Sequence, residues 1–369
     1  MIIYFIFLTI IFELMILDKL ISLKKSQANY FYNDFSTNVL PYYSVNPGKK
    51  FSYLIILAII FIFSFSAFRF NVGWDYIEYY NTVKFDSITN IVSNGEYATI
   101  FLVEIARSTG ITNLYFAINS FVCIFLISKT IKNYSVDPWL SIIFFICFPL
   151  FYLNSFSVIR FFTALSITFY GIKYIENRKF LKYLIVVVLA SLFHNSASLA
   201  LLFYFVGNIK FKTSRIVLIL VTIPIARNII NKFVVIYFPE YSSYTQITSV
   251  QEGTKAIIFL TIVGILALIL RDRITEGDSV ANIYFNIYFI GLGIYLMFFT
   301  QGTMGHRLSL YGTIYSLLLI PKMVEPIKHN KEGMLLMLFL YSLFIIMFLF
   351  IVNVGSTTYI PYRTIFGNK

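Results

Sequence analysis

Long apolar runs recur along the whole chain, and only short polar stretches separate them. The chain is 59% hydrophobic and 12% charged, whereas soluble domains average about 45–50% apolar and about 25% charged residues. Apolar residues that are spread so evenly along a chain cannot all be buried in one soluble core. A helix needs about 20 apolar residues to cross a bilayer, and runs of this kind recur here. The sequence therefore predicts an all-α polytopic membrane protein, with residues 1–369 forming a single membrane-embedded helical domain.

About twelve segments have the apolar length of a transmembrane or re-entrant helix. The regions 138–175 and 180–209 are short enough to form tight hairpins that do not fully cross. The first segment lacks a basic leader and a small-residue cleavage site, so we expect a retained helix rather than a signal peptide. The segments cover residues 2–22, 51–69, 113–131, 138–153, 156–175, 180–193, 196–209, 214–231, 255–270, 280–300, 307–321 and 333–353.

Lysine and arginine total 29 against 17 acidic residues, a net charge of +12. If both termini lie outside and about twelve helices cross, most of the basic residues fall in cytoplasmic connections, as the positive-inside rule requires. We therefore expect the excess charge to serve topology and not nucleic-acid binding. Cys123 and Cys147 both lie in apolar runs, which indicates small buried residues rather than a disulfide.

Arg160 stands in the apolar and aromatic stretch FPLFYLNSFSVIRFFTALSITFYGI, with no acid nearby in the chain. A charge at such depth costs at least about 2.5–3.5 kcal/mol on insertion scales, and arginine cannot lose its proton to avoid that cost. An anionic group should meet it, either a partner carboxylate or a substrate. The same topology places the other unusually located basic residues on the outer face, among them Arg69, His194, His306 and Arg307.

The outer segment 69–112 begins with FRFNVGWDYIEYY, in which acids lie among aromatic residues. Two interpretations fit: a sugar-binding surface made by Trp74, Tyr76 and the acids, or an aromatic belt in which Arg69 contacts lipid headgroups. Asp75 and Glu78 are three apart and would share one helix face. The segment continues with EYATIFLVEIARSTG, which predicts an interfacial helix that begins near Glu96 and on which Arg107 pairs with Glu104.

Two sites with histidine complete the outer-face candidates. His194 interrupts VVVLASLFHNSASLALL at a polar turn and fits either a hydrogen-bonded structural residue or a functional one. His306 and Arg307 start a helix, with Tyr311 one turn later. Helix amino termini attract anions and guanidinium groups bind phosphate oxygens in a bidentate way, so this region predicts a phosphate clamp. The chain has no P-loop and no zinc-protease or CxxC motif, so we expect no metal and no cofactor.

A series of short motifs then runs in order along nearly the whole chain. It resembles the EpsG-like, Wzy-type polysaccharide polymerases. Two positions depart from that pattern, Phe161 where glutamine is frequent and Trp74 where a small polar residue is common. The motifs are Arg69 followed by GxDYxxY (Gly73, Asp75, Tyr76, Tyr79), the acid Glu96, IRxxxA (Ile159, Arg160, Ala164), HxSA (His194, Ser196, Ala197), RxxxY (Arg307, Tyr311) and the terminal YIPYR (Tyr359, Pro361, Tyr362, Arg363).

The resemblance implies a metal-independent glycosyltransferase, similar to C-type glycosyltransferases, that joins undecaprenyl-diphosphate-linked oligosaccharide repeats. It implies a bacterial inner (cytoplasmic) membrane location, an active site facing the periplasm or exterior, lipid-linked donor and acceptor, and a chain-length regulator as a further partner. Asp75 is then the first candidate base, and Arg160, Arg307 and His194 complete the catalytic set. The substrate-binding candidates are Arg69, Trp74, Tyr76, Glu78, Glu96, His306 and Tyr311.

Two other functions stay open at this point. A ligase that moves finished glycan to another acceptor would need the same diphosphate clamp. A flippase for lipid-linked oligosaccharide would also be helical, but alternating access favours polar residues near the midplane and repeated halves. The chain shows no convincing internal repeat, which favours the polymerase over the transporter.

Overall fold

The computed structural model describes residues 1–33, 51–85, 91–92, 94–237, 254–298, 303–328 and 330–367. The regular structure of these residues is helical, apart from a β-bridge between Arg69 and Thr364. The predicted all-α class is therefore confirmed, whereas the number of membrane crossings stays a prediction. Both cysteines are buried free thiols, as the sequence indicates.

The amino-terminal part contains α1 (Ile2–Asn33), α2 (Tyr53–Ala67), α3 (Tyr76–Lys84), α5 (Tyr97–Thr109), α6 (Asn113–Tyr134) and α7 (Pro138–Cys147). The middle contains η1 (Asn154–Phe156), α8 (Ile159–Tyr170), α9 (Ile172–Glu176), α10 (Phe180–Ser191), η2 (Asn195–Ala200) and α11 (Leu201–Gly207). The remainder contains α12 (Thr213–Tyr237), α13 (Thr254–Ile269), α14 (Arg271–Thr275), α15 (Ser279–Phe298), α16 (Thr303–Thr313), α17 (Ser316–Val324), η4 (Glu325–Ile327), α18 (Lys331–Val354) and α19 (Ser356–Tyr359).

Three described helices, α6, α15 and α18, have the length and composition to cross a membrane. They differ in burial, because most of α15 packs inside the protein whereas α18 leaves one side uncovered. Leu335, Phe339 and Ile346 of α18 are 62–64% exposed. An apolar surface of this extent on an outer helix is one that a bilayer covers. The architecture is that of a helical membrane protein with α15 near its centre.

Several predicted helices are interrupted. The predicted helix 196–209 begins as the 3-10 segment η2, where Ser198 Oγ donates to the carbonyl of Asn195 at 2.9 Å. Such side-chain bonds compete with regular helix geometry. The predicted helix 156–175 is divided into α8 and α9, and the predicted helix 307–321 begins earlier and is divided into α16 and α17. These breaks place polar turns beside the membrane-embedded helices.

Helices α15 and α16 cross at very close range, because each presents a glycine to the other. A Cβ added to Gly312 would lie 2.6 Å from the Cα of Gly291, and one added to Gly291 would lie 2.5 Å from the backbone nitrogen of Thr313. Small residues at helix crossings allow backbones to approach in this way. The crossing fixes α16, which carries Arg307, against the central helix.

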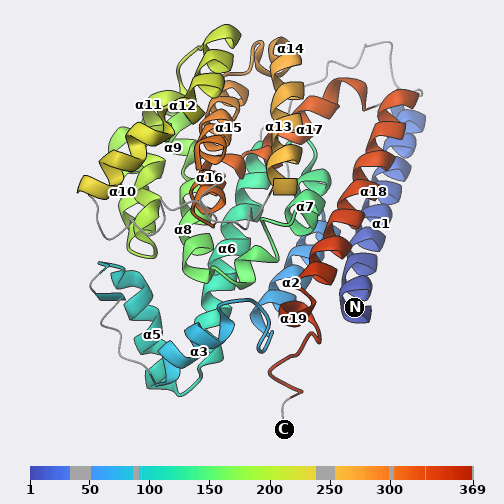
Figure 1. The fold of residues 1–369 in the computed structure, drawn as a ribbon. Coiled ribbons are helices and arrows are strands. Elements are labelled where there is room, and N and C mark those ends of the chain that lie inside the picture. Colours follow the sequence, from blue (N-terminus) through green and yellow to red (C-terminus); the bar gives the residue numbers. More distant parts are fainter. Residues whose placement is uncertain are drawn as a thin grey trace.

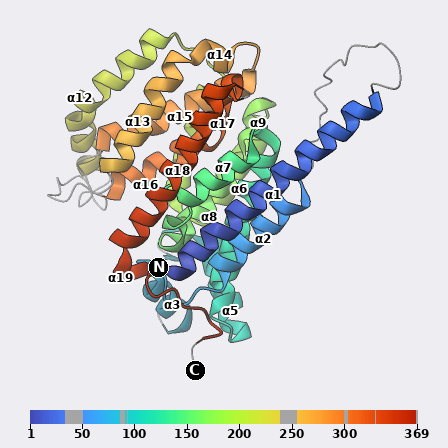
Figure 2. The same cartoon turned by 90° about the vertical axis from the view of Figure 1, so that its right-hand side faces the viewer.

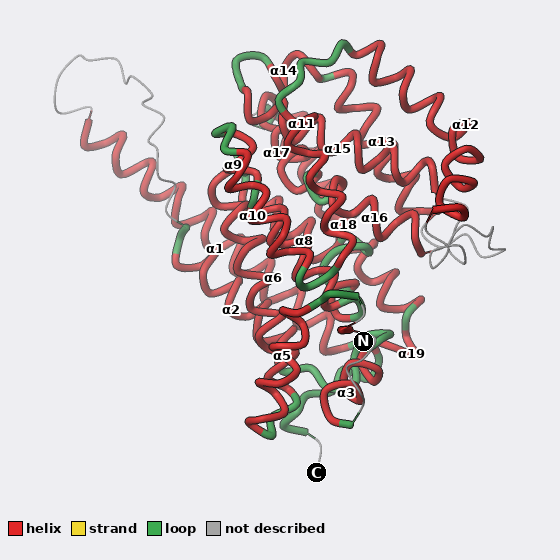
Figure 3. Tube along the Cα trace, turned by 90° about the vertical axis from the view of Figure 1, so that its left-hand side faces the viewer, coloured by secondary structure: helices red, strands yellow, loops and turns green. Residues whose placement is uncertain are grey.

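Both chain termini lie at one end of the molecule, together with α3, α5 and α19 (Figures 1 and 2). Helix α14, which carries Arg271 and Arg273, lies at the opposite end. Loop segments surround α3 (Figure 3). The helix predicted within residues 96–110 is present as α5, and Arg107 pairs with Glu104 at 3.3 Å as expected. The described part of segment 69–112 is therefore one end of the bundle.

Candidate active site

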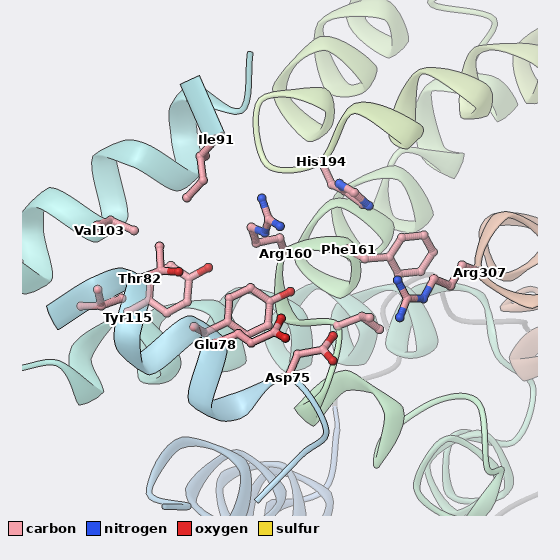
Figure 4. Close-up of a pocket in the computed structure, with 13 residues that line it drawn as sticks. Asp75, Glu78, Thr82, Ile91, Val103, Tyr115, Arg160, Phe161, His194 and Arg307 are labelled. Atoms are coloured by element: carbon pink, nitrogen blue, oxygen red, sulfur yellow. The ribbon is translucent and has the colours of Figure 1, made fainter. Parts of the chain in front are cut away.

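A cavity of about 580 Å³ lies between α3, α5, α8 and α16 (Figure 4). Its volume falls within the range of sites that take small molecules, about 300–1,000 Å³. Charged residues of both signs line it together with aromatic and aliphatic ones. The lining residues are Asp75, Glu78, Tyr79, Thr82, Val83, Ile91, Val103, Tyr115, Val158, Arg160, Phe161, His194 and Arg307.

One wall of the cavity is acidic and comes from α3 and the residue before it. Asp75, Glu78, Tyr79 and Thr82 are spaced by three, four and seven positions, so one helix face presents all of them. Burial raises the pKa of the Asp75 carboxyl above its ordinary value; Arg307 partly offsets this shift and Glu78 adds to it. Asp75 is thus a carboxylate with more than ordinary affinity for a proton, facing a partly enclosed space.

The other wall carries cations from three separate elements. Arg160 lies in the first turn of α8, His194 in the turn between α10 and η2, and Arg307 on α16. Figure 4 shows these side chains directed at the same space, with Asp75 across from them. The structure therefore brings the two arginines that the sequence singled out into one shared cavity.

Glu96 lies behind this cationic wall and supplies the anion that Arg160 requires. Its carboxylate is 2% exposed and forms an ion pair with Arg160 Nη1. Its second oxygen lies 2.7 Å from His194 Nδ1. The partner residues are 64 and 98 positions away in the chain, so local spacing gave no signal of these contacts. Of the two anions expected for Arg160, a partner carboxylate is present.

Two further features distinguish Arg160. Its guanidinium lies 5.6 Å from the centroid of the Tyr79 ring, at cation–π distance. Its Nε is buried and has no hydrogen-bond partner among the described residues. Buried donors in folded proteins nearly always form a hydrogen bond to protein or water. A bound group could accept the hydrogen bond of this Nε.

Arg307 differs from Arg160 because it has no carboxylate bound to it. Within the described part of the chain it forms no ion pair and no hydrogen bond, and it lines the cavity. Its charge acts on Asp75 across the cavity. An uncommitted guanidinium beside an enclosed polar space is suited to bind an anion.

Arg69, a predicted substrate-binding residue, does not line the cavity. It is 1% exposed, and its guanidinium donates to the carbonyls of Val72 and Phe156, each at 3.2 Å, and to that of Ser66. The Phe156 ring lies 4.5 Å from the guanidinium carbon. Backbone oxygens thus hold this cation, and Arg69 joins the loop before α3 to η1.

Gly73 and Trp74 continue this junction. Gly73 has φ of +119°, and an added Cβ would lie 2.4 Å from the carbonyl oxygen of Phe156, so a side chain is excluded there. The backbone nitrogen of Trp74 donates to Ser157 Oγ at 2.9 Å, and Trp74 is 64% exposed and does not line the cavity. The glycine of the GxDY motif therefore sets the position of Asp75 relative to the start of α8.

Three other predicted site residues lie next to the cavity but do not line it. Tyr76 is buried and stacks on Phe116, with ring centroids 4.4 Å apart. Tyr311 is buried, and its hydroxyl lies 3.1 Å from Ser196 Oγ. His306 is buried beside Arg307, and its Nδ1 has no partner among the described residues.

The sequence analysis left several lining residues out of its site candidates, among them Tyr79 and Phe161, which it named only as parts of motifs. Tyr79 follows Asp75 by four positions, so helical spacing was an available signal. Phe161 directly follows Arg160 and also packs against Tyr311, with ring centroids 4.9 Å apart. Its position on the lining shows that the departure from the family pattern lies inside the site.

Comparison with known proteins agrees with the resemblance seen in the sequence. A model of the EpsG family matches residues 52–364, a range that includes every residue lining the cavity. The chain therefore belongs to the EpsG family, and this membership indicates a role of the polysaccharide-polymerase type. No curated protein and no solved structure matches the chain.

Proposed function

We propose that this member of the EpsG family joins undecaprenyl-diphosphate-linked oligosaccharide repeats into a polysaccharide and releases lipid diphosphate. The observation that carries the proposal is the shared cavity, in which Arg160 and Arg307 face Asp75 and Glu78. A diphosphate leaving group needs cations, and a sugar hydroxyl needs a proton acceptor. The two walls offer both within one space.

In the proposed reaction, a hydroxyl oxygen of the acceptor repeat attacks the anomeric carbon of the donor repeat. The bond from that carbon to the diphosphate oxygen breaks, and its electron pair stays on the phosphate. Because negative charge grows on the leaving group, fixed guanidinium groups in a low-dielectric cavity stabilise the transition state more than the ground state. Arg307 and Arg160 serve this role. Arg160 is also paired with Glu96, whereas Arg307 has no ion-pair partner among the described residues.

Asp75 is the proposed general base. It lies on the wall across from the arginines (Figure 4), so an acceptor hydroxyl bound beside it approaches the anomeric carbon from the side away from the diphosphate. The raised pKa of its carboxyl makes its ionised form a stronger proton acceptor than an ordinary aspartate. The hydroxyl proton passes to Asp75 as the new glycosidic bond forms.

The remaining parts of the proposal concern the membrane location, the partners and the absence of a metal from the reaction. We place the cavity at the outer face of the bacterial cytoplasmic membrane, with the bilayer as a partner and a chain-length regulator as a further one. We propose that no metal takes part, because the guanidinium groups already supply positive charge at the leaving group. A chelator should then leave the reaction rate unchanged.

The test is incubation of the purified, reconstituted protein with defined lipid-diphosphate repeats. A ladder of products, each one repeat longer than the last, is the expected result. A ligase, which the same cavity would suit, would transfer glycan once to a different acceptor and give no ladder. Movement of intact lipid-linked repeats across the bilayer without bond formation would instead establish a transporter and overturn the proposal.

A further inference from the structure

Glu96 is a buried carboxylate that contacts two cavity-lining side chains from behind. One of its oxygens is paired with Arg160 and the other lies 2.7 Å from His194 Nδ1. Because the negative charge of Glu96 cancels that of Arg160, the cationic wall keeps only the charge of Arg307 when His194 is neutral. A diphosphate carries more negative charge than this single cation can balance.

The contact between Glu96 and His194 is fixed by the backbone around it. Glu96 immediately precedes α5, and the first turn of α5 is attached to the end of α10. The backbone nitrogen of Ala98 donates to the carbonyl of Leu192 at 3.0 Å, and Thr99 Oγ1 donates to that of Phe193 at 3.0 Å. Helices α5 and α10 are far apart in the sequence, and these bonds between them fix the Glu96 carboxylate next to the His194 imidazole.

This geometry settles which ring nitrogen of His194 is free. Nδ1 must carry a hydrogen to donate to the carboxylate, so Nε2 is the nitrogen left for other partners. Nε2 makes no hydrogen bond within the described part of the chain, and the side chain lines the cavity between Arg160 and Arg307. When Nε2 is protonated, Glu96 stabilises the imidazolium from behind.

We infer that His194, held by Glu96, is a proton-dependent third cation of the anion site, with Nε2–H donating to a diphosphate oxygen. Glu96 is the positioning residue for this group. The inference rests on the proposed function for the identity of the anion, a diphosphate. The other charged groups facing His194 are Arg160 and Arg307, which oppose its protonation, and Asp75 and Glu78 across the cavity, which favour it.

The test measures binding of inorganic diphosphate to the purified protein by calorimetry at about pH 6 and about pH 8. Wild-type protein is compared with Glu96→Gln, which keeps the side-chain shape but removes the charge. The affinity ratio cancels the titration of the ligand itself. Because the variant also leaves Arg160 without its carboxylate, the two proteins can differ in affinity at either pH, and the informative quantity is the change in their affinity ratio between the two pH values. We expect the affinity of wild type to rise about tenfold relative to that of the variant from the higher to the lower pH, as for the gain of one charge-assisted contact.

His194→Asn is the second variant. It should also lack the gain in affinity at the lower pH, because it removes the titrating ring while leaving Glu96 paired with Arg160. Glu104→Gln is the matched control, since Glu104 pairs with Arg107 on the exposed side of the same helix. It should follow wild type at both pH values.

If Glu96→Gln and His194→Asn each keep the pH dependence of wild type, Glu96 has only a structural role and the inference is wrong. Should Glu96→Gln fail to fold, the His194→Asn result decides alone. If diphosphate binds as expected but no product ladder forms, the proposed polymerase function fails while the anion site stands.

Discussion

Three arginines that the sequence analysis singled out show how the surroundings of a residue decide its role. Arg69 is surrounded by backbone carbonyls, Arg160 is paired with the buried carboxylate of Glu96, and Arg307 is uncommitted within the described residues. All three are charged at any physiological pH. The partners of each arginine therefore decide its role. Arg69 stabilises the fold, Arg160 contacts both Glu96 and the cavity, and Arg307 can bind an anion.

Replacing Arg69 with methionine should lower the stability of the folded protein. It should not affect the glycosyl-transfer step directly, because Arg69 does not line the cavity. The change leaves the carbonyls of Ser66, Val72 and Phe156 without their buried donor, which costs about 3 kcal/mol or more. Thermal unfolding in detergent should show a clear fall in the midpoint, whereas Lys212→Ala, at an exposed position, should not. An unchanged midpoint for Arg69→Met would contradict the structural role.

Asp75→Asn should reduce polymerisation and at the same time stabilise the protein. Because the folded-state pKa of Asp75 is raised, its ionised form disfavours folding at neutral pH, and this cost disappears as pH falls through the raised pKa. Asparagine removes that cost and also removes the base. Activity of wild type should fall as pH is lowered, beginning above the ordinary aspartate value of about 3.9.

The measurement is a rate profile against pH together with unfolding midpoints at neutral pH. Glu104→Gln serves as the control, because that carboxylate faces solvent on α5. Full activity in Asp75→Asn would assign the base elsewhere.

At the scale of elements, the site depends on two junctions that hold helices at fixed distances. Gly73 sets the loop before α3 against η1, and the pair Gly291 and Gly312 sets α16 against α15. The first junction positions Asp75 and the second positions Arg307. None of these glycines lines the cavity, but each holds an element that carries a lining residue.

Gly312→Ala should therefore impair activity without touching substrate. The added methyl would lie 2.6 Å from Gly291 Cα, so α16 must shift, at a cost of about 1–3 kcal/mol for overpacking. We expect both a lower unfolding midpoint and shorter polymer. Gly264→Ala on α13 is the control, because its Cβ would meet the end of the Leu292 side chain, which can rotate. Equal effects of the two variants would contradict the role of the crossing.

The sequence showed which residues were exceptional but not what they contact. Arg160 stood out because a charge inside an apolar run is costly, and that argument holds in any fold. Arg307 stood out because it starts a helix next to His306, where an anion can bind. The pairing of Glu96 with Arg160 and His194 depends on how α5 docks against α10, which no local pattern encodes. Arg69 was a substrate-binding candidate, and the backbone carbonyls that accept its hydrogen bonds here leave no mark in a sequence.

At the scale of the whole molecule, the cavity lies at the end that carries both termini, α3 and α5, away from α14 and its basic residues. This arrangement agrees with a topology in which cytoplasmic connections carry most positive charge. It also confines the charged chemistry to one end of the bundle. An enzyme that acts on substrates presented at one leaflet needs no polar path through the membrane.

Cysteine labelling tests this orientation in intact cells. Cys123 and Cys147 are buried, so wild-type protein should stay unlabelled by a membrane-impermeant maleimide. Ser108→Cys, at the exposed end of α5, should be labelled from outside, and Lys212→Cys, before α12, only after the membrane is opened. The reverse pattern would place the cavity on the cytoplasmic side.

The most direct test of the shared anion site is product length with Arg307→Lys in the reconstituted polymerisation assay. Lysine keeps the charge but cannot bind phosphate oxygens in a bidentate way. Loss of that geometry should lower the yield of multi-repeat product by about 10- to 100-fold, while single lipid-linked repeats accumulate and Lys212→Ala makes polymer of normal length. Polymer of normal length from both Arg307→Lys and Arg160→Lys would show that these guanidinium groups do not hold the diphosphate.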